Sequence, residues 1–170
     1  VENLVDLIAR ENEKTNEIDL HVYSCYDENA ENMSVLYKNT EYEYIKVPNS
    51  VKLLDRCIYF VMKNILRKRK HLSYRYIVQR IYYIEQVSKS LSKKSFDRII
   101  IENHMTLLST MRRKKNYKKY LGKYYYHSHN VITSDFGNKD LLKNCKAIIS
   151  VSEFISSKIK KHLGNECNAE

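Results

Sequence analysis

Hydrophobic side chains recur along this chain with two periods, one typical of helices and the other typical of strands. Residues 2–14 carry apolar side chains at helical spacing, which predicts an opening helix. Residues 18–25 alternate apolar and polar side chains, and residues 41–47 form a similar short stretch that ends at Pro48. Both segments are therefore predicted strands.

The middle of the chain returns to the helical period. A helix is predicted from the Pro48-Asn49-Ser50 start signal to about residue 65, and a second one follows over residues 77–91. Residues 96–103, "FDRIIIEN", hold three consecutive isoleucines, which indicates a strand buried on both faces. Residues 105–120 are then predicted to be helical.

The last part of the chain alternates strands and helices. Residues 123–130, "KYYYHSHN", are a predicted strand, as are residues 146–152, and a short helix is expected between them at residues 139–144. A helix over residues 153–163 closes the pattern. This order predicts an α/β fold in a single domain over residues 1–170, with a mostly parallel sheet and helices on both faces.

Composition narrows the classes of partner. The chain has 170 residues and a net charge of +10, with 43% hydrophobic residues, three glycines and one proline, as expected of a folded globular protein. A basic chain suits nucleic acid, anionic membranes or phosphorylated ligands, although compositional drift in an AT-rich genome would enrich the same Lys, Asn, Ile and Tyr. Residues 56–94 interleave bases with tyrosines. That stretch fits a membrane-facing surface, a base-stacking surface or an ordinary solvated face.

Cysteine usage and hydropathy both favour the cytoplasm. The four cysteines form no C-x-x-C pair, so we expect free thiols in a reducing compartment. The first ten residues lack the bases and the long apolar run of a signal peptide. The most apolar segment, "CIYFVM", is too short to span a bilayer.

Small polar and ionisable residues follow the predicted strands, at the edge of the sheet where ligands bind in α/β proteins. Because His127 and His129 are two residues apart, they share one face of their strand. The residues at the other strand ends are Ser24, Cys25, Glu102, Asn103, His104, Ser128, Asn130, Ser152 and Glu153.

Structural roles compete with ligand binding at several of these positions. Asn130 suits a turn, and Ser152 followed by Glu153 suits a helix N-cap with an acid in its first turn. Glu102 and His104 are also close enough in sequence to pair with each other on the surface.

A metal site is a further alternative for the two histidines. His127 and His129 are able to share a zinc ion if His104 or Glu102 supplies a third ligand. The spacing does not require an ion, and we expect no metal and no cofactor.

Several of these stretches resemble one known family. "YYYHSHN" is similar to its strand ending in His followed by Asn or Asp, and residues 141–164, "LLKNCKAIISVSEFISSKIKKHLG", are similar to its a-D-x-I-I-a-V-S-x-F strand and helix. "VENLVDLIAR" resembles the helix after its Gly-Gly-x-Glu loop, and "FDRIIIENH" fits the same domain. The chain thus resembles the N-terminal, acceptor-side domain of the family-four (group 1) glycosyltransferases, which pair two Rossmann-like domains in the GT-B arrangement.

The resemblance implies roles for individual residues. His129 matches the cleft histidine, which would lie near the donor sugar and hydrogen-bond a hydroxyl or stabilise charge. Glu2 matches the acid of the glycine loop, and Ser152 and Glu153 match the serine and its neighbour beside the nucleotide cleft. We expect substrate binding by Glu2, Glu102, Asn103, His104, His127, Asn130, Ser152 and Glu153, with His129 as the catalytic residue.

The resemblance also implies an activity. The implied activity is transfer of a sugar, with retention of configuration, from a nucleotide-sugar co-substrate to a glycan or lipid-linked acceptor. Such a transfer would serve bacterial surface polysaccharide synthesis. The family's first strand and glycine loop would precede Val1, and its donor-binding domain lies outside the 170 residues. We therefore expect a fragment that is inactive alone and needs the donor domain or a partner subunit.

Two other functions remain open from the sequence. One is a basic α/β module that binds nucleic acid without catalysis, which we disfavour, and the other is one subunit of a split transferase. If the chain is a glycosyltransferase domain, we expect residues 56–94 to dock on an anionic membrane. The protein would then be peripheral on the inner face of the plasma membrane.

Overall fold

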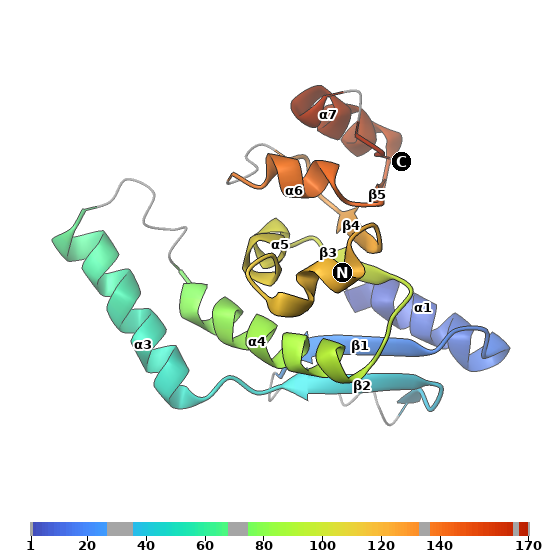
Figure 1. Ribbon diagram of the computed structural model, residues 1–170, viewed down its shortest axis with the longest axis horizontal. Coiled ribbons are helices and arrows are strands. Elements are labelled where there is room, and N and C mark those ends of the chain that lie inside the picture. The colour runs from blue at the N-terminus through green and yellow to red at the C-terminus, as the bar shows by residue number, and fades with distance from the viewer. Residues whose placement is uncertain (1, 27–35, 68–74, 133–136, 165–166, 170) are drawn as a thin grey trace. The chain divides into compact units, whose positions relative to one another are not determined.

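The computed structural model divides the chain into two compact units that both combine helices with parallel strands (Figure 1). The N-terminal unit is Glu2–Val87 and the C-terminal unit runs from Ser88. The predicted α/β class with parallel strands is confirmed, but the described strands pair in two small sheets instead of one. The structure describes residues 2–26, 36–67, 75–132, 137–164 and 167–169.

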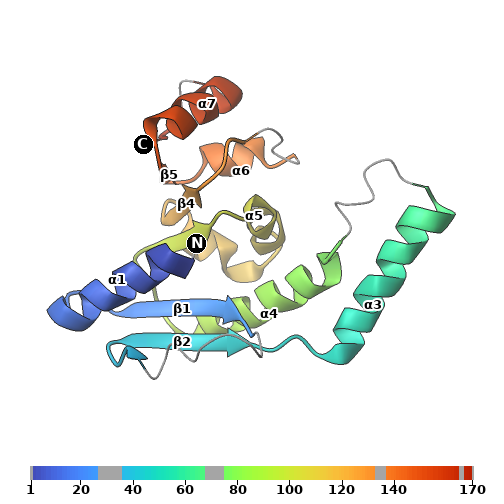
Figure 2. The ribbon, with the colours of Figure 1, turned by 180° about the vertical axis from the view of Figure 1, so that it is seen from behind.

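The N-terminal unit is built on a two-stranded parallel sheet. Strand β1 (Leu20–Cys25) pairs with β2 (Thr40–Ile45), and Leu20 lies opposite Thr40. Helix α1 (Glu2–Thr15) lies along one face of this sheet, and α4 (Ile77–Lys93) begins beyond the sheet and reaches its other face near Tyr83 (Figures 1 and 2). The helices of this unit form at the predicted positions, and of these α1 and α4 cover the sheet.

Buried polar contacts join the elements of the N-terminal unit. The Asn12 side chain donates to the Asn39 carbonyl at 3.0 Å and accepts from the Ile18 backbone N–H at 3.2 Å. The Tyr83 hydroxyl of α4 donates to the Tyr23 carbonyl of β1 at 2.8 Å. Each bond satisfies a polar group that burial would otherwise leave without a partner.

Helix α3 (Asn49–Phe60) follows β2 and continues into η1 (Val61–Ile65), a π-helical turn. Asp55 is its one buried residue, and the Asp55 carboxylate accepts from the Val78 N–H at 2.8 Å and from Gln79 Nε2 at 3.1 Å. Asp55 therefore caps the first turn of α4 from a neighbouring helix, which fixes the face that α3 turns toward α4.

The C-terminal unit contains a three-stranded parallel sheet in the order β3-β4-β5. The strands are β3 (Ile99–Glu102), β4 (Tyr124–Ser128) and β5 (Ala147–Ser150). The helices between and after them are α5 (Met105–Met111), η3 (Lys115–Tyr120), α6 (Lys139–Lys143) and α7 (Glu153–Leu163).

The predicted helix over residues 105–120 differs from the structure. Helix α5 ends at Met111, and the chain resumes as the 3-10 helix η3 at Lys115. The three connecting residues, Arg112, Arg113 and Lys114, are all bases, and Lys115 follows them, so like charges repel each other across this turn. The segment also lacks apolar residues at helical spacing, so nothing stabilises a continuous helix there.

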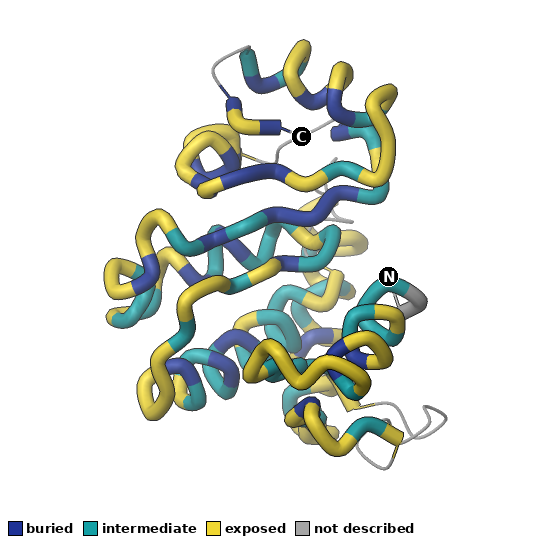
Figure 3. The backbone as a smooth tube through the Cα atoms, turned by 90° about the vertical axis from the view of Figure 1, so that its right-hand side faces the viewer, coloured by how far each residue is buried: buried dark blue, intermediate teal, exposed yellow. Residues whose placement is uncertain are grey.

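The central strand β4 is the most buried strand of the C-terminal unit, with four of its five residues buried; Figure 3 shows burial along the backbone. Tyr124 and Tyr126 are each 2% exposed, and Leu108 of α5 and Ile159 of α7 are fully buried. The Tyr120 hydroxyl lies 2.9 Å from the carbonyls of both Leu91 and Lys94. Of the three tyrosines in this predicted strand, Tyr124 and Tyr126 are therefore core residues, whereas Tyr125 is half-buried.

The outer edge of β5 is covered by the segment 167–169. Ile148 donates its backbone N–H to the Asn168 carbonyl at 2.7 Å and forms a parallel bridge with Ala169. The Ser156 hydroxyl of α7 donates to the Ala169 carbonyl at 3.3 Å. These bonds satisfy groups that an open strand edge would leave unpaired.

The four cysteines are all free thiols, two exposed and two buried. Among the described helices, none is both long enough and apolar enough to cross a membrane.

Candidate functional site

The carboxyl ends of β3 and β4 bring a carboxylate and two imidazoles together. The parallel register places Glu102 opposite His127. Register partners in a parallel sheet direct their side chains to the same face, and His129, two residues after His127, returns to that face. Pairing of the two strands therefore places on one face three residues that are up to 27 positions apart in sequence.

One oxygen atom of Glu102 contacts both histidines. Glu102 Oε2 lies 2.9 Å from His127 Nδ1 and 3.3 Å from His129 Nε2. The two imidazole rings meet edge to face with centroids 4.4 Å apart. We call Glu102, His127 and His129 the Glu-His-His cluster; its three ligand atoms all lie within 4.8 Å of one another.

Access to the cluster differs between its two histidines. The His127 side chain is 6% exposed, whereas the side chains of His129 and Glu102 are each 22% exposed. A ligand that approaches this end of the sheet would therefore reach His129 and Glu102 before His127. His127 is better placed to orient the carboxylate than to contact a substrate.

Asn103 supports the cluster with its backbone and its side chain. Its N–H donates to the His127 carbonyl at 2.8 Å, and its Oδ1 accepts from the His129 N–H at 3.3 Å. Its φ angle is +44°, in the left-handed region that asparagine tolerates better than most residues. The turn at the end of β3 thus fixes the segment that carries His129.

Ser128 is a supporting residue that the sequence analysis did not include among the binding residues. It is 1% exposed, and its hydroxyl donates to the Asn130 carbonyl at 2.9 Å. This bond holds the bend after β4, which agrees with the turn role considered for Asn130. Its place at the end of a predicted strand was the sequence signal for it.

His104 lies outside the cluster. It is exposed and precedes α5, and its Nδ1 lies 2.8 Å from the Thr106 hydroxyl. Of the two candidates for a third ligand, the structure therefore brings Glu102, and not His104, to His127 and His129.

Ser152 and Glu153 follow β5 and are both exposed. Ser152 is the N-cap of α7, because its hydroxyl accepts from the Ile155 N–H at 3.3 Å. Glu153 stands in the first turn of that helix, where a negative charge is favourable. The capping role predicted for this pair is confirmed.

Glu2 begins α1 in the N-terminal unit, and its side chain lies outside the described residues. The structure therefore gives no contact for this candidate binding residue.

Burial suppresses ionisation of two groups in the C-terminal unit. It raises the pKa of the Cys145 thiol to about 12, so this cysteine is protonated at neutral pH and is a poor nucleophile. Burial also raises the pKa of Tyr126 to about 12, against a backbone hydrogen bond with Met105 that acts in the opposite direction. Neither group therefore ionises readily at neutral pH.

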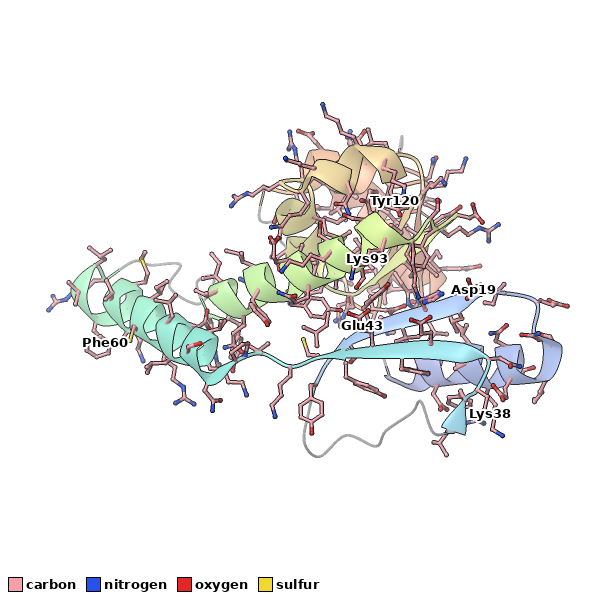
Figure 4. All side chains as sticks on the ribbon, turned by 60° about the horizontal axis from the view of Figure 1, so that its bottom comes forward. Asp19, Lys38, Glu43, Phe60, Lys93 and Tyr120 are labelled. Carbon is pink, nitrogen blue, oxygen red and sulfur yellow. The ribbon has the colours of Figure 1, made fainter. Side chains whose placement is uncertain are left out.

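An exposed apolar face on α3 and η1 is a second candidate surface. Leu54 and Ile65 are 52% and 64% exposed, and Phe60 is 58% exposed (Figure 4). We call this surface the α3–η1 apolar face; it comprises Leu53, Leu54, Phe60, Val61, Ile65 and Leu66.

No protein-family model, curated protein or solved structure matches the chain significantly.

Proposed function

We propose that residues 1–170 form the acceptor-side domain of a retaining glycosyltransferase with the GT-B arrangement. The observation that carries the proposal is the meeting of His129 with Glu102 and Asn103 at the carboxyl ends of two neighbouring parallel strands. Ligands of open α/β sheets bind at such ends. The sequence resemblance independently assigns His129 to the cleft of these enzymes.

The chemistry of sugar transfer suits these groups. Retaining transfer develops positive charge on the donor sugar and negative charge on the departing diphosphate. The Glu102 carboxylate would stabilise the positive charge on the donor sugar. His129, which Glu102 and Asn103 hold in place, would hydrogen-bond a sugar hydroxyl. Because these groups are already bound to one another, little reorganisation would accompany the reaction.

The diphosphate would be held by other parts of the enzyme. The resemblance assigns Ser152 and Glu153 to the nucleotide side of the cleft, and Ser152 begins α7, whose N-terminus favours anions. The nucleotide itself would be bound by a separate donor domain or by a partner subunit. The acceptor would be a glycan or a lipid-linked glycan of a surface polysaccharide.

A transfer assay tests this function. The product of the complete open reading frame would be supplied with a panel of UDP-, GDP- and dTDP-sugars, and release of the nucleotide would be measured. We expect His129→Ala to lower kcat by about 100-fold or more, the usual effect of removing a group that stabilises the transition state. His162→Ala, a substitution in α7 outside the cluster, is the matched control and should keep the wild-type rate.

The two possible failures have different meanings. If wild type transfers sugar and His129→Ala does so equally well, the enzyme class stands and the role of His129 is wrong. If the folded wild-type protein turns over no donor in the panel, the proposed activity itself is wrong.

We also propose that the protein docks peripherally on an anionic membrane, on the inner face of the plasma membrane, through the α3–η1 apolar face. Leu54 and Val61 are seven residues apart, as are Leu53 and Phe60, so they form one stripe. Asp55 contacts α4 from a different side of α3. The apolar stripe of α3 is therefore exposed to solvent. Lys52, Arg56 and Lys63 flank it, as on helices that lie in a membrane interface.

The nucleic-acid alternative has weaker support. It requires a continuous groove of bases and aromatic rings, whereas the described part of α3 and η1 presents mainly aliphatic side chains. Most of the "RKRKH" sequence lies outside the described residues.

Sedimentation with lipid vesicles tests the docking. We expect the protein to pellet with vesicles that contain phosphatidylserine and not with neutral phosphatidylcholine vesicles, and to be released by salt. Leu54→Glu should abolish the binding, whereas Leu121→Glu, at an exposed leucine of the C-terminal unit, should not. Equal binding by Leu54→Glu would overturn the assignment of this face.

A further inference from the structure

We propose that the Glu-His-His cluster binds one divalent transition-metal ion, with Glu102 Oε2, His127 Nδ1 and His129 Nε2 as its ligands. The inference rests on the geometry of these three residues and not on the sugar-transfer proposal. Among the residues that the structure describes, they form the one group of three histidine, cysteine or acidic side chains whose ligand atoms converge in this way.

The spacing of the ligand atoms fits a small coordination sphere. Zinc bonds to nitrogen and oxygen are about 2.0–2.2 Å long, which places neighbouring ligand atoms of a tetrahedral site about 3.3 Å apart. Glu102 Oε2 lies at 3.3 Å from His129 Nε2 and at 2.9 Å from His127 Nδ1. An ion would therefore need the second contact to widen by roughly 0.4 Å. It would also need the two ring nitrogens, which lie within 4.8 Å of each other, to take up a similar spacing.

The ligand types select the class of metal. Two imidazoles and one carboxylate suit Zn²⁺, Fe²⁺ and related first-row ions, whereas Mg²⁺ and Ca²⁺ prefer oxygen ligands throughout. Three protein ligands also leave at least one position of the ion open, as in catalytic zinc sites. With His129 and Glu102 each 22% exposed, water or a ligand hydroxyl is able to reach that position.

The backbone around the cluster is already fixed without an ion. Asn103 bonds to the backbone of both His127 and His129, and the Ser128 hydroxyl closes the bend that follows. Metal sites depend on such surrounding bonds to hold their ligands in position. Coordination would replace two imidazole–carboxylate hydrogen bonds, so any proton on the two facing nitrogens must leave or move across its ring.

His21 shows what a non-chelating arrangement of the same residue types looks like. Its Nε2 lies 2.9 Å from Asp19 Oδ1, and its Nδ1 lies 3.2 Å from Glu41 Oε2. The two carboxylates thus face opposite nitrogens of one ring, and no single ion is able to contact all three groups. In the cluster, by contrast, two rings point at one oxygen atom.

Calorimetry on the full chain tests the site. The protein would be stripped with a chelator, dialysed and titrated with Zn²⁺, and Co²⁺ would serve as a second probe because its visible absorption reports coordination. We expect one Zn²⁺ per chain at micromolar concentration, and Co²⁺ bands typical of four or five ligands. Glu102→Gln and His129→Gln should each weaken binding by more than about 100-fold, since loss of an outer-shell partner alone costs about 10- to 100-fold.

Two controls separate ligand loss from misfolding. His21→Gln removes a histidine held between two carboxylates and should leave Zn²⁺ affinity unchanged. Circular dichroism would show that each variant is folded; His129→Gln carries the test because His127 is buried and its replacement endangers the fold.

The outcomes are decisive in both directions. Stoichiometric binding that is lost in both cluster variants and kept in His21→Gln supports the site. Absence of Zn²⁺ and Co²⁺ binding by folded wild type overturns it, and so does binding that survives in the folded cluster variants. Neither result depends on transfer activity, so failure of this proposal is distinguishable from failure of the proposed function.

Discussion

His127 and His129 contact each other edge to face, with ring centroids 4.4 Å apart, although Ser128 separates them in the chain. Glu102 Oε2 bonds to both rings. The three side chains therefore behave as one unit, and a change at any member is expected to reach the other two.

Replacing Glu102 by alanine should disturb two histidines at once. Without the shared carboxylate, both rings lose a hydrogen-bond partner, so the imidazole NMR signals of two of the six histidines should shift together. Glu153→Ala, at an acid in the first turn of α7, is the control and should leave both signals in place. A shift of only one signal would contradict the idea of a single unit.

Substitutions at Asn103 should separate backbone strain from side-chain bonding. Asn103→Gly loses the side-chain bond to the His129 N–H but fits the φ angle of +44° easily, whereas Asn103→Ala loses the bond and is strained as well. We expect the alanine variant to be less stable than the glycine variant by about 1–2 kcal/mol. Urea unfolding of the two proteins measures this difference, and equal stabilities would show that the turn relaxes.

Removal of the Ser152 cap should destabilise α7. Ser152→Ala leaves the Ile155 N–H without its acceptor and should lower the free energy of unfolding by about 1 kcal/mol. Ser152→Asp restores an acceptor and should recover most of that loss. Ser157→Ala makes the same chemical change within α7 and should be neutral or slightly stabilising. If the unfolding temperature of Ser157→Ala is lower than that of Ser152→Ala, the capping role of Ser152 is wrong.

Tyr126, one of the two buried tyrosines of β4, should make the fold sensitive to alkali. Burial raises the pKa of Tyr126 from 10.0 to about 12, so in this range the folded state retains a proton that the unfolded state has lost. The associated stability is fully present below about pH 10 and is lost as the pH rises toward about 12.

Tyr126→Phe tests this dependence because phenylalanine does not titrate. We expect the fall in unfolding free energy between neutral pH and about pH 11 to be smaller in the variant, by up to about 1.4 kcal/mol. Tyr125→Phe, at a less buried position of the same strand, is the control. An identical alkaline fall in wild type and Tyr126→Phe would exclude a contribution from this residue.

The helices and strands were largely predictable from local periodicity. The apolar runs of β3 and β4 identified both strands, but the predicted burial of β3 on both faces is wrong: Ile101 is buried, whereas Ile100 is 48% exposed. A strand at the edge of a small sheet leaves one face uncovered, and the apolar run alone does not reveal this. The break between α5 and η3 was missed because the apolar pattern on its two sides hid the repulsion among the intervening bases.

The geometry of the site was less accessible from the sequence. The two histidines were recognisable from their i, i+2 spacing, and Glu102 and His104 were both candidates for a third group beside them. The choice between these two depends on the register of β3 against β4. Sequence proximity suggested His104, whereas strand pairing delivers His127 and His129. Long-range register depends on tertiary packing, so one strand read alone does not reveal it.

The parallel pairing of all described strands also has a consequence for how the protein folds. The paired residues are roughly 20 to 25 positions apart in every strand pair, as for Leu20 with Thr40 and Ile99 with Tyr124. No sheet contact in either unit therefore arises from a hairpin, and each one requires closure of a long loop before it gains any pairing energy. Local helices would form early on the folding pathway, and the Glu-His-His cluster would assemble among the last events, when β3 and β4 finally align.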